Sequence, residues 1–439
     1  MYMTMLDPFQ EKYGTKVGGL MYLPCLIGEL FWTASTLRVL GLTVSVVLGL
    51  NISASIIGSA CVAVCYTLFG GLFSVAYTDI VQLICSLLGM AFPVPFIFRS
   101  EHVHLNETIP FREWFGHVER SDIGSLIDLY LLLFFGGIPW QAYFQRVLAT
   151  QSPRQAQYLS YGAVVGCLLS SVPSIIIGII AKRADFTSAG FNSSVVEADP
   201  SLVLPVAIQF LTPRWVTFVG MGAVSAAVMS SMDSCLLSSA SLFTHNIYRG
   251  ILRPNASERE RMWVLRISLI FYGILGTTLA ISVNSVYKIF TLSADILYVS
   301  LFPLLVCVIY APSVNAYGVL AGFFSSFALR LMAGESQFYI PAIIKYPFYD
   351  LENEKQKFPH KSLAMIFNFM ITFGVSWFTN LVFSKKWLSE QYDILEVTSE
   401  HVPVFTKKLK SRKMKSEPTD NGLSKPLTLH DSESITAES

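Results

Sequence analysis

Charge is scarce in this sequence. Only 14% of its 439 residues are Asp, Glu, Lys or Arg, while 53% are hydrophobic and the mean hydropathy is +0.52. A soluble globular domain carries roughly 25% charged residues. The deficit indicates burial in a membrane, and the formal net charge of +1 gives no reason to expect nucleic acid as a partner.

Paired cysteines and enzyme motifs are also lacking. The seven cysteines include no CxxC spacing, and most fall in apolar stretches, which is typical of small buried side chains and not of a disulfide framework or a zinc site. No GxSxG, HExxH or glycine-rich phosphate loop occurs, so the sequence does not predict an enzyme. The first residues carry charge and no apolar core, which is not the pattern of a signal peptide.

What the sequence does contain is a series of long apolar stretches. A bilayer core about 30 Å thick requires about 20 apolar residues in a helix, whereas the shorter stretch 201–211 predicts a re-entrant or surface helix. The pattern predicts an all-α polytopic membrane protein with about ten transmembrane helices. The predicted spans are 17–48, 51–69, 71–98, 122–145, 156–181, 213–247, 263–285, 287–310, 314–332 and 361–384.

Both ends of the chain are expected on the cytosolic side. An even number of spans places them together, and residues 385–415 carry eight Lys and Arg, which favours the cytosol. The chain then divides into a cytosolic segment 1–16, a transmembrane domain 17–384 and a cytosolic, mostly disordered tail 385–439. Tyr392-Asp393-Ile394-Leu395 in this tail has the spacing of a tyrosine-based endocytic signal, with a chance match as the alternative.

Two glycines and a proline interrupt one predicted span near its middle. Gly136-Gly137-Ile138-Pro139 breaks the helical hydrogen-bond ladder, and Trp140 and Gln141 follow directly. Unpaired backbone groups at membrane depth are tolerated only where they are buried in protein or line a cavity. Broken helices commonly bind the cargo of secondary transporters. A simple kink is the alternative, but we favour a binding element in which Trp140 and Gln141 contact the substrate.

Another predicted span contains adjacent hydroxyl groups among small residues. Ser230 and Ser231, with the carbonyl group of Ala227 one turn earlier, offer the hard oxygen ligands that a small cation such as sodium needs. Asp233 strengthens this interpretation, because a carboxylate within a membrane is costly and usually functional. The alternatives are that the serines mediate helix packing and that Asp233 lies at the cytosolic end of the span.

Tryptophan within a span is a further signal. Trp32 and Trp140 could form two walls of an aromatic cage for a quaternary ammonium group, which ring faces attract by about 2 kcal/mol when desolvated. Core packing is the alternative for Trp32. Gly70-Gly71 predicts a turn, and Asp79, near the start of the helix that follows, is assigned only a structural role opposite the helix dipole.

Several of these segments resemble one family. YTLFGGLFSVAYTDIVQ at 66–82 closely resembles the signature of the sodium:solute symporter family, and GGIPWQAYFQRVLA at 136–149 and GAVSAAVMSSMDS at 222–234 resemble two further family segments. Together with MLDPFQEKYG at 5–14, they resemble the choline-transporting members specifically. The resemblance runs from residue 3 to about residue 385.

The resemblance implies a fold and an activity. The family has a LeuT-like core of two inverted five-helix repeats, and this chain begins at what resembles the third core helix, so that its first helices and half of its site are expected to be missing. The implied activity is sodium-coupled, chloride-dependent uptake of choline at the plasma membrane, feeding acetylcholine synthesis. The resemblance also implies presynaptic terminals and synaptic vesicles as locations. It assigns Ala227, Ser230 and Ser231 to sodium, and Trp32 and Trp140 to choline.

Two alternatives stay open for the function. The solute could be a sugar, an amino acid or a vitamin, or the chain could fail to transport and instead modulate longer copies of the transporter. The expected partners are choline, sodium, chloride and the lipid bilayer. A homo-oligomer and an endocytic adaptor on the tail are further candidates.

The topology generates a prediction about glycosylation. The sequons at Asn106 and Asn192 fall in loops expected outside the cell, whereas the sequon at Asn255 falls inside. We expect Asn192 to be the main glycosylated residue, so Asn192→Gln should abolish most of the gel shift on enzymatic deglycosylation and Asn255→Gln should not. An unchanged shift in Asn192→Gln would contradict the assignment.

Overall fold

The computed structural model describes residues 2–395, except for 105–117, 192–199, 284 and 353. These described residues are almost entirely helical, and only three isolated β-bridges occur among them. Nine helices in the described part are long and apolar enough to cross a membrane. The predicted all-α membrane architecture is therefore confirmed. Chain contacts define one unit over Met1–Ser399, and the remainder from Glu400 lies outside the described residues.

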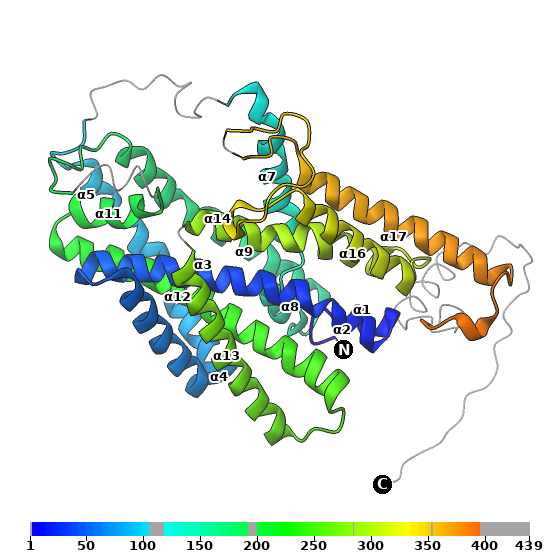
Figure 1. The fold of residues 1–439 in the computed structure, drawn as a ribbon. Coiled ribbons are helices and arrows are strands. Elements are labelled where there is room, and N and C mark those ends of the chain that lie inside the picture. Colours follow the sequence, from blue (N-terminus) through cyan, green and yellow to red (C-terminus); the bar gives the residue numbers. More distant parts are fainter. Residues whose placement is uncertain (1, 105–117, 192–199, 284, 353, 396–439) are drawn as a thin grey trace, which may run out of the picture. The chain divides into compact units, whose positions relative to one another are not determined.

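Figure 1 shows how the helices follow one another along the chain. In chain order they are α1 (Asp7–Tyr13), α2 (Thr15–Leu20), α3 (Tyr22–Leu48), α4 (Ile52–Ala91), α5 (Val94–Phe98), α7 (Ile123–Gly136), α8 (Gln141–Leu148), α9 (Pro153–Ala181), α11 (Val203–Phe210), α12 (Arg214–Leu242), the π-helix η3 (Phe243–Leu252), α13 (Glu258–Ser282), α14 (Val286–Ile296), the π-helix η4 (Leu297–Leu301), α15 (Phe302–Tyr310), α16 (Ala316–Met332) and α17 (His360–Ser384).

Nine of the ten predicted spans coincide with helices of spanning length. The predicted span 314–332 forms α16, which has only 17 residues and is about 26 Å long at 1.5 Å per residue. This length is at the lower limit for a bilayer, so α16 is the shortest of the ten predicted spans. The stretch 201–211 forms α11, whose Val206 and Ile208 are fully buried. It is therefore embedded in the protein and does not lie on the surface.

The element α4 contains two spans and reverses direction between them. Thr67 donates a hydrogen bond to Asp233, while Asp79 accepts one from Ser230. Asp233 and Ser230 are only one turn apart on α12. Twelve residues of straight helix would instead separate Thr67 from Asp79 by about 18 Å. The chain must therefore fold back between them, in the segment that contains Gly70-Gly71.

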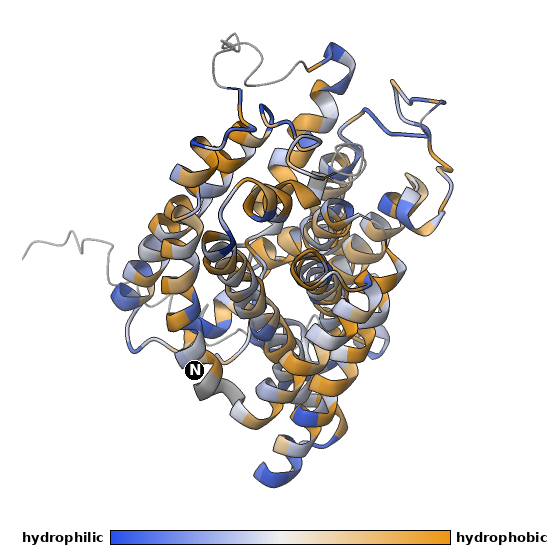
Figure 2. Cartoon of the chain, turned by 90° about the vertical axis from the view of Figure 1, so that its left-hand side faces the viewer, coloured by the Kyte–Doolittle hydropathy of each residue, from blue (hydrophilic) through white to orange (hydrophobic). Residues whose placement is uncertain are grey.

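Small residues allow the central helices to approach closely. α12 packs along both α3 and α4 (Figure 1), and a Cβ atom added to Gly89 would lie 2.5 Å from the Cβ atom of Ala223. Close backbone approach of this kind replaces the hydrophobic driving force that helices lack within lipid. Figure 2 shows hydrophobic residues along the helices and hydrophilic ones at helix ends and in loops. Exposed side chains such as Phe69, Phe134 and Phe218 accordingly suit contact with lipid.

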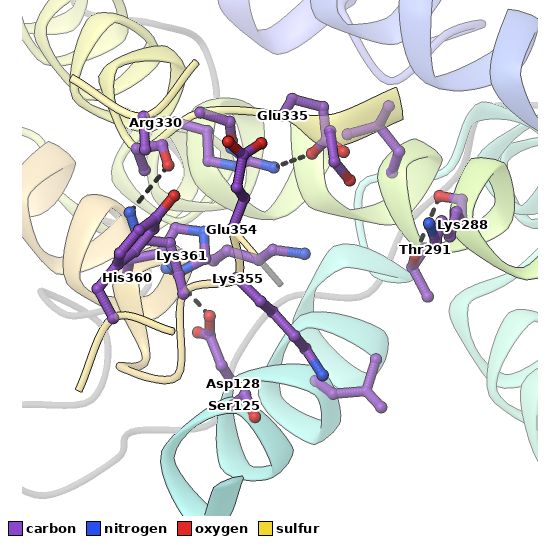
Figure 3. A pocket seen from close by; sticks show the side chains of 18 of the residues that line it. Ser125, Asp128, Lys288, Thr291, Arg330, Glu335, Glu354, Lys355, His360 and Lys361 are labelled. Carbon is purple, nitrogen blue, oxygen red and sulfur yellow. Dashed lines mark hydrogen bonds and ion pairs between the residues drawn. The ribbon is translucent and has the colours of Figure 1, made fainter. Parts of the chain in front are cut away.

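A buried ionic network ties α14 to α16 and α17. Asp295 on α14 is fully buried, and its Oδ2 atom lies 2.7 Å from Arg330 Nη2 on α16 and 3.5 Å from Lys361 Nζ on α17. Arg330 also pairs with Glu335 at 2.7 Å. Asp128 on α7 accepts hydrogen bonds from the first backbone N–H groups of α17, including Lys361. Asp128, Arg330, Glu335 and Lys361 border a cavity of about 740 Å³ (Figure 3).

This network generates a prediction about stability. Arg330→Met leaves the buried Asp295 carboxylate without its main partner, which should lower the free energy of unfolding by about 3–5 kcal/mol. Asp295→Leu combined with Arg330→Met should recover much of the loss, because neither charge remains buried. Thermal unfolding of the purified protein in detergent measures both, with the exposed Lys345→Met in the same cavity as control. Equal midpoints for Arg330→Met and Lys345→Met would refute the prediction.

Candidate functional site

The site begins where one membrane helix stops and another starts. α7 ends at Gly136 and α8 begins at Gln141, with Trp140 in an extended conformation as the N-cap residue. A Cβ atom at Gly136 would lie 2.5 Å from the carbonyl oxygen of Ala294 on α14, so only glycine permits this contact. Pro139 is buried in the break. The interruption therefore lies against α14.

Three aromatic rings from three elements meet beside the break. The ring centroids of Trp32 on α3 and Trp140 are 5.0 Å apart with planes inclined at 66°. Phe290 on α14 lies 5.3 Å from Trp32. The sequence analysis paired the two tryptophans but missed Phe290, because nothing in its local sequence distinguishes it from a lipid-facing phenylalanine. We call these three residues the aromatic corner.

The side chain of Gln141 binds the N-terminal segment. Its side chain is 2% exposed, and its Oε1 atom accepts a hydrogen bond of 2.9 Å from the backbone N–H of Met5. The sequence analysis assigned Gln141 to the substrate, whereas in the structure its carbonyl oxygen is already engaged. The cause is that four non-helical residues separate α7 from α8, so helical spacing no longer indicates which way Gln141 points.

The N-terminal segment also contacts the π-helix η3 and the end of α15. Asp7 lies 3.4 Å from His245 Nε2; burial acts to raise the pKa of Asp7, but hydrogen bonds from His245, Thr4 and backbone amides outweigh it and hold the pKa well below its usual range. Lys12 donates to the carbonyl oxygens of Cys307 and Ala311 at 3.1 and 2.6 Å. Burial lowers the pKa of Lys12 to about 8. Residues 2–13 thus connect Gln141 to η3 and α15.

The predicted sodium segment lies in the middle of α12. Ser231 donates to the carbonyl oxygen of Ala227 at 3.2 Å. Ser230 instead donates to Oδ1 of Asp79 on α4 at 2.5 Å. The Asp79 carboxylate thus accepts a hydrogen bond from this segment, and it offers further oxygen atoms of the kind that hard cations prefer. The sequence analysis gave Asp79 only a structural role, because the contact joins residues 151 positions apart.

Arg146 on α8 reaches the same carboxylate. Its Nη2 atom lies 2.8 Å from Oδ2 of Asp79 and donates to Ser234 at 2.7 Å. Asp79 therefore binds α12 through one oxygen and α8 through the other. The pair is partly open, with side-chain exposures of 45% for Arg146 and 19% for Asp79.

Two other acids are buried within the helix bundle. Asp233 is fully buried, and its Oδ1 atom accepts a hydrogen bond from Thr67. Glu29 is 2% exposed and accepts a hydrogen bond from Ser238 at 3.0 Å. The second carboxylate oxygen of each has no hydrogen-bond partner among the described residues. Asp233 is therefore not at the cytosolic end of its span, but it does not join Ser230.

The remaining predicted residues belong to the glycosylation sites and the endocytic signal. Asn106 and Asn192 fall outside the described residues. Tyr392 is 59% exposed, whereas Leu395 packs against the largest apolar cluster and its backbone N–H donates to the hydroxyl of Tyr317 at 3.3 Å. The two ends of the predicted endocytic signal thus differ in exposure.

An all-helical membrane protein with a broken helix, an aromatic corner and an oxygen-rich cluster beside it has the features of a secondary transporter. Residues 2–325 match the sodium:solute symporter family. The chain belongs to this family.

Its relatives include characterised transporters. The chain is 44% identical over 89% of its length to high-affinity choline transporter 1 of Drosophila melanogaster, 45% over 92% to that of Caenorhabditis elegans and 41% over 90% to that of Homo sapiens. It spans 64%, 72% and 70% of these relatives, respectively. It also shares the fold of a Na+-coupled sialic acid symporter, with a TM-score of 0.63, 17% identity, and coverage of 85% of this chain and 77% of that one.

The α12 hydroxyl groups generate a prediction about sodium. Ser230→Ala combined with Ser231→Ala removes two oxygen ligands, each worth about 0.5–1.5 kcal/mol. The half-saturating sodium concentration for uptake should rise roughly 5–150-fold, while solute affinity at saturating sodium changes little because the aromatic corner is intact. Ser171→Ala, which removes an exposed hydroxyl on α9, is the control. An unaltered sodium activation curve in the double variant would count against this site.

Proposed function

We propose that the protein carries out sodium-coupled uptake of choline across the plasma membrane by alternating access. The observation that carries this proposal is the aromatic corner of Trp32, Trp140 and Phe290 at the break between α7 and α8. The cationic end of choline has no hydrogen-bond donor, so ring faces and not polar groups suit it. The high-affinity choline transporters among the relatives support the same substrate.

The corner also suggests how choline enters. The rings of Trp32 and Trp140 are in contact at 5.0 Å, so a trimethylammonium group does not fit between them in this arrangement. Choline binds on the open side of the corner or after the rings part. Because Trp140 begins α8, movement of this short helix is the simplest way to separate them.

Sodium binds beside the corner in this proposal. Its ligands are the hydroxyl groups of Ser230 and Ser231, the carbonyl oxygen of Ala227 and the carboxylate of Asp79, which lies 2.5 Å from the Ser230 hydroxyl. Sodium favours the outward-open state because it binds that state more tightly than the other. Asp233, which contacts Thr67, does not ligate the ion in this proposal.

A symporter for a different solute is the main rival. Sodium/proline symporters of Haemophilus influenzae and Salmonella typhimurium are also relatives, at 27% identity over 52% of the chain and 25% over 63%. Proline carries a carboxylate and needs hydrogen-bond donors, which three hydrocarbon-rich rings supply poorly. Competition of labelled choline uptake by a quaternary ammonium analogue, and not by proline, supports choline.

Finer features of the proposal come from the family resemblance. They are chloride dependence, supply of choline for acetylcholine synthesis, and residence in presynaptic and synaptic vesicle membranes as a glycoprotein modified at Asn192 and Asn106. Tyr392 and Leu395 act as an endocytic signal once Leu395 leaves Tyr317. Association with other copies of the transporter, without transport by this chain, is the alternative.

Substitution of Trp140 in the full-length protein tests the proposal. Trp140→Leu keeps an apolar side chain but removes the ring quadrupole, so the apparent choline constant should rise roughly 5–30-fold, or about 1–2 kcal/mol. Trp140→Phe should cost less, because a weaker quadrupole remains. The control Trp377→Leu alters an exposed tryptophan on α17 and should leave the constant unchanged. Equal choline uptake by the Leu and Phe variants at normal surface levels would reduce Trp140 to a packing residue.

A further inference from the structure

We propose that Arg146 is a tethered cation that occupies the Asp79 carboxylate when sodium is absent, and that its displacement by sodium releases α8 to position Trp140 for choline. Arg146 is thus a positioning residue that links the two ligands. The inference rests on the proposed sodium site, and its test below does not require transport.

The contacts around Asp79 carry the first step. Oδ2 of Asp79 lies 2.8 Å from the Arg146 guanidinium, and Oδ1 accepts the Ser230 hydroxyl at 2.5 Å. Both carboxylate oxygens of Asp79 are therefore engaged, and Arg146 also donates a hydrogen bond of 2.7 Å to the Ser234 hydroxyl oxygen. A sodium ion that uses Asp79 and Ser230 as ligands must compete with the guanidinium for the same carboxylate. One cation replaces the other, and the local charge stays balanced.

The exposure of the pair fits an exchange and not a fixed structural bond. The Arg146 side chain is 45% exposed and that of Asp79 19%. Ion pairs open to solvent contribute little to stability, because water solvates the separated charges well. This contrasts with Arg330 and Asp295, whose side chains are 8% and 0% exposed. Arg146 can therefore leave Asp79 for solvent at low cost, whereas Arg330 cannot leave its partner.

The position of Arg146 on α8 carries the second step. α8 has eight residues, with Trp140 as its N-cap and Arg146 in its second turn. The backbone N–H of Phe144 bonds to the carbonyl of Trp140 at 3.2 Å, which makes the tryptophan continuous with the helix. Three side chains of this helix bind other segments: Gln141 binds Met5, Tyr143 binds Ser160 on α9, and Arg146 binds Asp79 and Ser234. Only the Arg146 contacts tie α8 to the Asp79 carboxylate, so their release frees α8 from that carboxylate and lets Trp140 shift with the helix.

The effect of Arg146→Gln on sodium affinity has opposite signs for a competing role and for a structural role. If Arg146 only stabilised the site, Arg146→Gln would weaken sodium binding. If Arg146 competes with sodium, Arg146→Gln leaves Asp79 free and strengthens sodium binding, while Arg146→Lys retains competition. Asp79→Asn removes the shared ligand and weakens sodium binding in either case, which makes it a control for the site itself.

The experiment measures sodium binding on the purified full chain in detergent at constant ionic strength, with N-methylglucamine replacing sodium. Thermal stabilisation gives the half-effect sodium concentration, and the sodium-dependent tryptophan emission that Trp140→Phe removes reports on α8. We expect Arg146→Gln to lower the half-effect concentration 3–10-fold and to abolish the sodium-dependent Trp140 signal. Arg146→Lys should behave like the unaltered protein, as should Arg154→Gln, a nearby arginine on α9.

Each outcome decides the inference. An unchanged or raised half-effect concentration in Arg146→Gln overturns it, as does the absence of any sodium effect in the unaltered protein. A lowered concentration with the Trp140 signal retained overturns the coupling to α8. If sodium behaves as expected but choline does not bind, the proposed substrate fails while the role of Arg146 stands.

Discussion

The interruption of a membrane helix at Gly137–Trp140 constrains everything around it. A broken helix releases backbone groups, and within a bilayer these must be enclosed by protein or line a cavity. Here the enclosure comes from α14, which approaches Gly136 so closely that no side chain fits, and from local turns such as the bond from Trp140 N–H to the Ile138 carbonyl at 2.9 Å. The aromatic corner is a consequence, since α3 and α14 bring Trp32 and Phe290 to the same place.

The short helix α8 connects the helix break to the Asp79 carboxylate. One end carries Trp140, and the same eight-residue helix carries Arg146 against Asp79 and the α12 hydroxyl groups. In the proposal, one rigid piece therefore joins a wall of the substrate site to the cation that competes with sodium for Asp79, which is a physical requirement for coupling the two bound species. The α14 side of the corner is, by contrast, fixed to α16 and α17 through the buried Asp295 and Arg330 pair. Movement is thus expected on the α8 side of the corner.

Much of this fold could be predicted from the sequence, because span length and glycine–proline breaks are local signals. Nine spans and the position of the helix interruption follow from them. The span predicted at 314–332 also forms a helix, which begins two residues later at Ala316. The family segments indicated the family itself, which the match over residues 2–325 confirms.

The site was harder to predict, because its contacts join distant segments. Asp79 and Arg146 are 67 positions apart, and no local pattern relates them. Gln141 was assigned to the substrate because it follows Trp140, but the non-helical break rotates it toward Met5. Asp233 lies three residues after Ser230 on the same helix, yet it contacts Thr67 while Ser230 contacts Asp79. The sequence placed the candidate residues on their helices, and tertiary packing decided which side chains meet.

Accumulation of labelled choline by proteoliposomes under an imposed sodium gradient tests the central claim most directly. The account predicts that an inward sodium gradient drives choline above its equilibrium level and that dissipating the gradient with a sodium ionophore releases it. Choline accumulation that is indifferent to the gradient, or gradient-driven accumulation of proline in its place, would contradict it.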